Sequence, residues 1–267
     1  MIFNRNTDTI ERHETLSLPL QGVESLNARI DMSVGDLIVR GGAATDELWH
    51  GELIMHPDFE AEVDQHVSNG RCDLRVKQAS PRVSMRGNSA RNIWDIAIND
   101  CVPTDLRVSQ SAGVAKLDLS ALSLTRLVVE RSVGESTIDL CGDHRQLSEV
   151  NVDSSTGNTT INMTGQFDAL DVLRINGSVG QITVDLRGTW GGDLDARIKT
   201  STGEVKLLLP ADVGVEVIAK TSIGGVRADG FIRDGTSYRN TICGSAPVTL
   251  RFKVTNSIGA IRLETAR

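Results

Sequence analysis

The sequence predicts an all-β protein, a solenoid of parallel strands stacked around an aliphatic core. Two observations carry this prediction: a recurring Ser-x-Gly tripeptide, and apolar residues at alternate positions on both sides of it. Alternation with period two is the pattern of a half-buried β-strand. A unit of two short strands cannot bury its apolar face alone, so copies must stack and pair with their neighbours.

The repeat has nine Ser-x-Gly copies, whose glycines are Gly35, Gly70, Gly113, Gly134, Gly157, Gly180, Gly203, Gly224 and Gly259. Between Gly113 and Gly224 successive glycines are 21 or 23 residues apart, whereas the gaps on either side are longer. We therefore expect a single-stranded, parallel β-helix-like solenoid of about nine units, regular in the middle and irregular at both ends.

Each unit is predicted to be strand, turn, strand. Around Gly134, for example, Leu127 and Val129 precede the turn and Ile138 follows it. The glycine supplies the backbone freedom of a tight corner. The serine hydroxyls are expected to form a ladder that bonds backbone groups left unpaired by the turn. A nucleophilic serine is disfavoured because no general base recurs beside it.

We expect one domain over residues 1–267, since no linker rich in Pro, Gly or Ser interrupts it. Irregular rungs and a cap are predicted for 1–110, regular repeats for 111–228, and a loop with a terminal rung for 229–267. Residues 1–20 would cover the first rung, because solenoid ends need capping. An uncovered final strand would favour self-association.

Composition excludes several classes of partner. The formal net charge of -7 argues against nucleic acid and anionic membranes, which attract basic surfaces. The sequence has no membrane-spanning apolar run and no signal-like N-terminus, so a cytoplasmic protein is expected, reaching the envelope only through a partner. The four cysteines are far apart without a C-x-x-C pair, which favours reduced, buried thiols over zinc ligands.

Stacked acids form the one candidate metal site. Five residues after their glycines stand Asp118, Asp139, Asn162 and Asp185, with Asp229 and Glu264 further along. Stacked oxygen ligands make calcium possible, but a solvated face is the simpler interpretation. Thr137, Thr160 and Thr183 are read as strand formers. His50, His56 and His66, near Asp58 and Glu60, lack metal-site spacing and are read as surface residues. We predict no catalytic, cofactor-binding or metal site.

Residues 28–42 (ARIDMSVGDLIVRGG), 102–108 (VPTDLRV) and 111–120 (SAGVAKLDLS) resemble the toast-rack domain family. Residues 255–263 (TNSIGAIRL) resemble related adhesin-type β-solenoids. The resemblance implies a non-enzymatic bacterial β-solenoid, in families linked to adhesion, the cell envelope and the response to cell-wall-active antibiotics. It implies no catalytic residues.

The sequence thus favours a non-catalytic structural or interaction protein that binds a protein partner or itself through a sheet edge. One alternative is a polysaccharide lyase or hydrolase on a β-helix. It would need clustered acids and aromatic sugar platforms, and candidates are few: Trp49, Trp94, Trp190, Tyr238 and five Phe. The other alternative is a ligand-sensing domain of envelope-stress signalling, which rests on the family resemblance.

Overall fold

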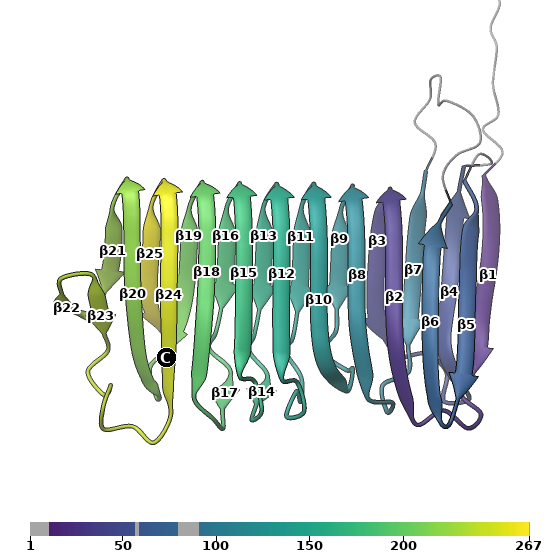
Figure 1. Ribbon diagram of the computed structural model, residues 1–267, viewed down its shortest axis with the longest axis horizontal. Coiled ribbons are helices and arrows are strands. Elements are labelled where there is room, and N and C mark those ends of the chain that lie inside the picture. The colour runs from purple at the N-terminus through teal and green to yellow at the C-terminus, as the bar shows by residue number, and fades with distance from the viewer. Residues whose placement is uncertain (1–10, 57–58, 80–90, 267) are drawn as a thin grey trace, which may run out of the picture.

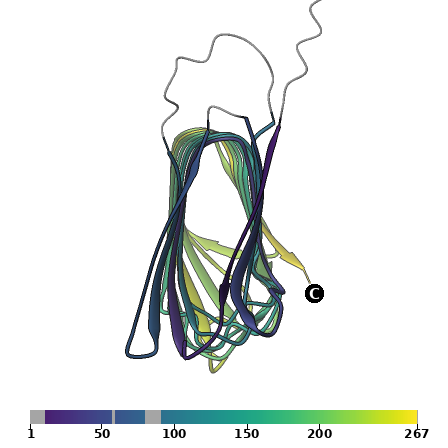
Figure 2. The same ribbon diagram turned by 90° about the vertical axis from the view of Figure 1, so that its right-hand side faces the viewer.

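The computed structural model describes residues 11–56, 59–79 and 91–266, so the first half of the predicted cap lies outside it. These residues form 25 strands and no helix. Most strands belong to two long sheets, which we call sheet A (11 strands) and sheet B (12 strands). The sheets form two facing walls along the whole molecule, joined by corners along one side (Figures 1 and 2).

Eight rungs make up the solenoid, each a strand of sheet B, a Ser-x-Gly corner and a strand of sheet A. The strands of sheet B are β2 (Ser25–Val34), β8 (Thr104–Ala112), β10 (Leu124–Val133), β12 (Glu149–Thr156), β15 (Val172–Val179), β18 (Leu194–Thr202), β20 (Gly214–Ile223) and β24 (Thr249–Ile258). Those of sheet A are β3 (Asp36–Gly41), β9 (Ala115–Asp118), β11 (Ser136–Asp139), β13 (Thr159–Asn162), β16 (Ile182–Asp185), β19 (Val205–Pro210), β21 (Val226–Asp229) and β25 (Ile261–Ala266). Neighbouring rungs pair in parallel, which confirms the predicted solenoid.

The core lies between the two sheets and consists mainly of Val, Ile and Leu. Register places equivalent apolar positions beside each other, as in Leu127 with Val150 and Ile138 with Ile161. All four are fully buried. Full burial of such a side chain is worth about 1.5–3 kcal/mol, so this repeated contact is the main stabilising force.

The corners require glycine for two reasons. Their glycines have φ between 123° and 138°, a region that favours residues without a Cβ. The corners also stack backbone on backbone: a Cβ on Gly157 would lie 1.9 Å from the carbonyl oxygen of Gly134. Glycine therefore recurs at the corners because successive turns are in direct contact.

The polar ladder of the corners differs from the predicted one. All eight corner serines are exposed, and their hydroxyls form no hydrogen bond with the described residues. The residue before the serine points inward instead, because side chains alternate along a strand. On four rungs it donates to the glycine carbonyl of the neighbouring corner. These bonds are Gln110 Nε2 to Gly35 O (2.6 Å), Arg131 Nη2 to Gly113 O (2.5 Å), Thr221 Oγ1 to Gly259 O (3.1 Å) and Asn256 Nδ2 to Gly203 O (2.8 Å).

One Ser-x-Gly copy is not a corner. Ser68-Asn69-Gly70 joins β5 (Ala61–Ser68) to β6 (Arg71–Gln78), which pair antiparallel within sheet B. Asn69 and Gly70 both have positive φ, 51° and 74°, as a two-residue type I′ hairpin requires. The solenoid therefore has eight corners among the described residues, and the ninth predicted unit is a hairpin.

The N-terminal end is irregular, as predicted. In sheet A, β7 (Ile93–Ile98) continues the parallel stack beyond β3. Two antiparallel strands follow, β4 (Glu47–Met55) and the outermost β1 (Arg12–Pro19). In sheet B, the β5–β6 hairpin closes the same end.

The C-terminal end departs from the predicted order. The strand pair β24–β25 lies inside the stack, between the rung β18–β19 and the rung β20–β21. The expectation that the final strands form the open rung is therefore wrong. A hairpin of β22 (Ile232–Asp234) and β23 (Ser237–Arg239), with its turn at Gly235, covers part of the edge of β20. Figure 1 shows β21 outermost in sheet A at this end.

On the side of the solenoid opposite the corners, three aromatic side chains of the middle rungs stack on one another. His144 lies 5.7 Å from Phe167, and Phe167 lies 4.9 Å from Trp190, between ring centroids. Phe167 and Trp190 belong to the short strands β14 (Gln166–Phe167) and β17 (Thr189–Trp190). Burial lowers the pKa of His144 to about 4, although the Asp143 carboxylate opposes the shift.

The cysteines match the sequence prediction of reduced, buried thiols only in part. All four are free thiols. Cys72 is buried, and burial together with the charge of Asp73 raises its pKa. Cys101 and Cys141 are exposed, so the prediction of buried thiols is wrong for them. Cys101 follows the end of β7 and Cys141 the end of β11, where the chain leaves sheet A for a loop.

Candidate functional site

The predicted acidic column exists as a geometric feature. Asp118, Asp139, Asn162 and Asp185 end four consecutive strands of sheet A and pair with one another in register. Parallel strands lie about 4.8 Å apart, so the side chains stack closely. Leu208 occupies the next rung, and it separates these residues from Glu264 and Asp229.

Most oxygens of this column already have partners. The Asn162 amide donates to Asp139 Oδ1 at 2.6 Å, and Arg187 pairs with Asp185 at 2.6 Å. Burial of Asp185 tends to raise its pKa, but the hydrogen bonds from Arg187 outweigh this and lower it. In the described part of the chain, no group of three or more His, Cys, Asp or Glu side chains has the arrangement of a metal site. The interpretation of the column as a solvated face stays a prediction, with calcium binding as its alternative.

The other predicted site residues are dispersed. His50 lies in β4 of sheet A and His66 in β5 of sheet B, with His56 in the connection between those strands. Asp58 lies outside the described residues. The aromatic candidates for a sugar platform, Trp49, Trp94, Trp190 and Tyr238, are all buried.

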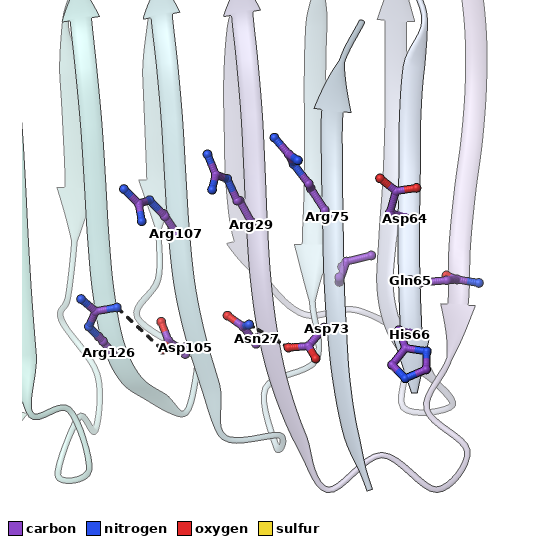
Figure 3. Close-up of a pocket in the computed structure, with 11 residues that line it drawn as sticks. Asn27, Arg29, Asp64, Gln65, His66, Asp73, Arg75, Asp105, Arg107 and Arg126 are labelled. Carbon is purple, nitrogen blue, oxygen red and sulfur yellow. Dashed lines mark hydrogen bonds and ion pairs between the residues drawn. The ribbon is translucent and has the colours of Figure 1, made fainter. Parts of the chain in front are cut away.

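Sequence reasoning missed a groove of about 550 Å³ on the outer face of sheet B, near the N-terminal end. We call it the arginine groove after Arg29, Arg75, Arg107 and Arg126, which come from β2, β6, β8 and β10. The first three form an in-register row, and Figure 3 shows their side chains side by side. Each of the three arginines in the row stands at an outward position of its own strand. Which strands are neighbours depends on strand order, which the sequence did not reveal.

Each guanidinium of the groove has a carboxylate partner. Asp31 binds both Arg29 and Arg75, Glu130 binds Arg107, and Glu149 binds Arg126, at 2.5–2.9 Å. Like charges directly opposite on a sheet repel, and these carboxylates offset that repulsion. The hydrogen bond from Arg126 lowers the pKa of Glu149. The four arginines of the groove therefore belong to an ion-pair network.

Strand edges are the other exposed feature able to bind a partner. In β5 the outer edge carries the exposed charged residues Glu62, Asp64 and His66, a pattern that discourages strand addition. In β21 the carbonyl of the preceding Gly225 faces β25, where it accepts from Ile261 N. Because backbone groups alternate along a strand, the N–H and C=O groups of Val226 and Ala228 face away from the stack, and no described strand pairs with them.

Apolar side chains accompany this open edge. Ile223, at the end of β20, is 66% exposed and lies in register with the exposed Ile258 of β24. Ile232, in the hairpin beside β20, is 63% exposed. Exposed apolar groups next to unpaired backbone groups are typical of a surface that binds protein.

The fold defines this chain as a repeat protein of the two-walled β-solenoid class. No helix able to cross a membrane occurs in the described residues. The chain belongs to the toast_rack family: residues 6–162, more than half of its length, match the family described as the N-terminal domain of toast_rack, DUF2154. This confirms the resemblance seen in the sequence.

One solved structure of the comparison shows the same fold. The "putative cell adhesion protein" from Clostridium sporogenes is 21% identical, with a TM-score of 0.52, over 96% of this chain and 100% of that one. A "putative adhesin" from Bacteroides fragilis is 13% identical, with a TM-score of 0.30, over 95% of this chain and 97% of that one. No curated protein matches the sequence.

Proposed function

We propose that this chain is a non-catalytic, adhesin-like interaction protein that binds another polypeptide by extending sheet A at β21. The observation that carries the proposal is the open edge, where Val226 and Ala228 present backbone donors and acceptors without a partner strand. An added strand would satisfy these groups, as in β-augmentation. A second copy of the chain offers the same edge, and two such edges can pair about a twofold axis.

Two further observations support an interaction role. The Clostridium sporogenes protein of the same fold is named for cell adhesion, and membership of the toast_rack family favours a setting at the bacterial cell envelope. The carboxyl groups with shifted pKa values, among them Asp73, Glu149, Asp193 and Glu216, all shift downward through hydrogen bonds and nearby arginines. A general acid needs the opposite shift, so this electrostatic pattern disfavours a hydrolase.

The proposal is tested by removing one outward donor. Ala228→Pro deletes an N–H that faces away from β25, so it leaves the pairing of β21 with β25 intact. We expect the wild-type protein to form dimers as its concentration rises, and the variant to remain monomeric. Light scattering coupled to size-exclusion chromatography measures both.

The matched control is Arg227→Gln, which changes an exposed side chain of the same strand and keeps every backbone donor. It should dimerise like the wild type. A wild-type protein that stays monomeric at every concentration, or an Ala228→Pro variant that dimerises as well as Arg227→Gln, would contradict pairing through this edge.

A further inference from the structure

A second basic surface lies on sheet B, near the C-terminal end. Arg174, Arg197 and Lys253 form an in-register row across the consecutive strands β15, β18 and β24. Two residues further along, Lys199 on β18 and Lys220 on β20 extend the surface toward the corners. All five are exposed, and we call them the basic face. These strands lie side by side in Figure 1.

The basic face differs from the arginine groove in its pairing. Arg174 reaches Glu149 at 3.6 Å. The other four cations, Arg197, Lys199, Lys220 and Lys253, have no ion pair with any described carboxylate. Four adjacent unpaired cations are unusual on a chain whose net charge is -7. No ion pair offsets their mutual repulsion, although Asp195 precedes Arg197 by two residues on the same face of β18. An anion bound there would be stabilised by charge complementarity.

Neighbouring groups indicate which kind of anion fits. The corner serines Ser201, Ser257 and Ser222 follow on β18, β24 and β20, with exposed hydroxyls that bond no described group. Such hydroxyls can donate to and accept from sugar hydroxyls. The outward positions of these strands hold no aromatic side chain, whereas proteins that bind single-stranded nucleic acid stack bases on aromatic rings.

We propose that the basic face binds an acidic polysaccharide, a sugar chain bearing carboxylate or sulfate groups. The cations lie on adjacent strands about 4.8 Å apart, so a chain running along the solenoid axis meets several of them in succession. Arg197 binds a carboxylate or sulfate through two parallel hydrogen bonds, and the lysines add point charges. The corner serines then contact uncharged hydroxyls of the same chain. This site is separate from the open edge of β21.

The test compares three immobilised probes at about 50 mM salt, where charge contacts are only partly screened. The probes are heparin, which carries sulfates, polygalacturonate, which carries carboxylates alone, and a thymidine oligonucleotide, which carries phosphates and bases. We expect the wild-type protein to bind at least one polysaccharide more tightly than the oligonucleotide. Comparing the two polysaccharides identifies the anionic group.

The test variant is Arg197→Gln/Lys199→Gln/Lys253→Gln, which removes three unpaired cations. It should bind the polysaccharide at least about tenfold more weakly, with a shallower dependence on salt. The control variant is Lys116→Gln/Lys206→Gln/Arg227→Gln, which loses the same charge from the outer face of sheet A. It should bind within about twofold of the wild type.

Three results would overturn the proposal. One is the absence of polysaccharide binding by the wild-type protein. Another is an equal loss of affinity in both triple variants, which would indicate attraction by overall charge. The third is an oligonucleotide bound at least as tightly as the polysaccharide that binds better. Matching thermal unfolding curves of the three proteins establish that any difference comes from the surface and not from the fold.

Discussion

The corners in the middle of the solenoid and the corner at its N-terminal end have the same shape, but different contacts stabilise them. Between β8 and β19 each corner glycine rests on the backbone of the preceding corner. At the corner of β2 and β3 no further rung exists, and side chains from distant segments take its place. The Asn92 amide donates to Val34 O, and Gln78 Oε1 accepts from Ser33 N at 2.7 Å. A repeat satisfies its backbone with the next copy, whereas an end needs dedicated side chains.

The largest effect is expected from placing a Cβ inside the middle stack. Gly157→Ala puts a methyl group against the carbonyl oxygen of Gly134, which cannot move without displacing the neighbouring rung. Together with the positive φ of 125°, this should lower the free energy of unfolding by at least about 3 kcal/mol. Chemical denaturation measures the loss.

The N-terminal region supplies the matched control. Gly42 also has a positive φ, 87°, but a Cβ there would meet no atom within 4 Å. Gly42→Ala should therefore cost only about 1 kcal/mol, the price of the backbone conformation. Equal costs at the two glycines would show that contact between corners contributes little.

The aromatic stack of the middle rungs predicts a pH dependence. His144 has a folded pKa of about 4 against an ordinary 6.5, so the unfolded chain binds the proton more tightly. The stability that follows from a neutral His144 is fully present above pH 6.5 and is lost as the pH falls toward 4. The loss should approach about 3 kcal/mol, measured by urea unfolding at several pH values.

His144→Phe should remove this pH dependence and keep a ring against Phe167. The control is His66→Gln, because His66 is exposed on β5 at the N-terminal end, away from the stack. An unchanged slope of stability against pH in His144→Phe would contradict the assignment.

The smallest effect on stability is expected at the inward-pointing residue that precedes the corner serine in the middle rungs. Burial lowers the pKa of Arg131, and its Nη1 has no hydrogen-bond partner among the described residues. Gln110, at the same position one rung earlier, reaches a glycine carbonyl with a neutral amide. Arg131→Gln should therefore raise the free energy of unfolding by up to about 1 kcal/mol.

Shortening a polar side chain at the N-terminal end should instead lower the free energy of unfolding. Asn92→Ala removes the donor to Val34 O and should cost about 1–2 kcal/mol, because no neighbouring rung can replace it. Thermal unfolding of both variants checks the contrast. A stabilised Asn92→Ala protein, or an Arg131→Gln protein destabilised by more than the Asn92 variant, would break it.

The sequence predicted the features that depend on local periodicity. The strand positions around Gly134 follow from alternation, and they match the structure. The hairpin at Asn69-Gly70 was also within reach, since Asn-Gly is a strong hairpin signal. The ring stack had a signal as well: His144, Phe167 and Trp190 are each 23 residues apart, the period of the repeat.

Strand order could not be predicted in the same way. The long gap between Gly224 and Gly259 indicates an insertion, but nothing local states that β24 pairs with both β18 and β20. All rung edges offer similar backbone groups, so the choice among them depends on packing across distant segments. The arginine groove, the basic face and the open edge at β21 all follow from that order, which is why the candidate surfaces escaped sequence reasoning.

The inserted strand pair β24–β25 also constrains how the protein is made. During synthesis the rung β20–β21 leaves the ribosome before the pair that finally separates it from β18–β19. Until residues 249–266 emerge, β18 and β20 can pair directly, because Gly203 and Gly224 keep the 21-residue interval of the regular repeat. Such a pairing would have to open to admit the last strands. A chain that lacks residues 249–266 is therefore expected to form a shorter stack in which β18 pairs directly with β20.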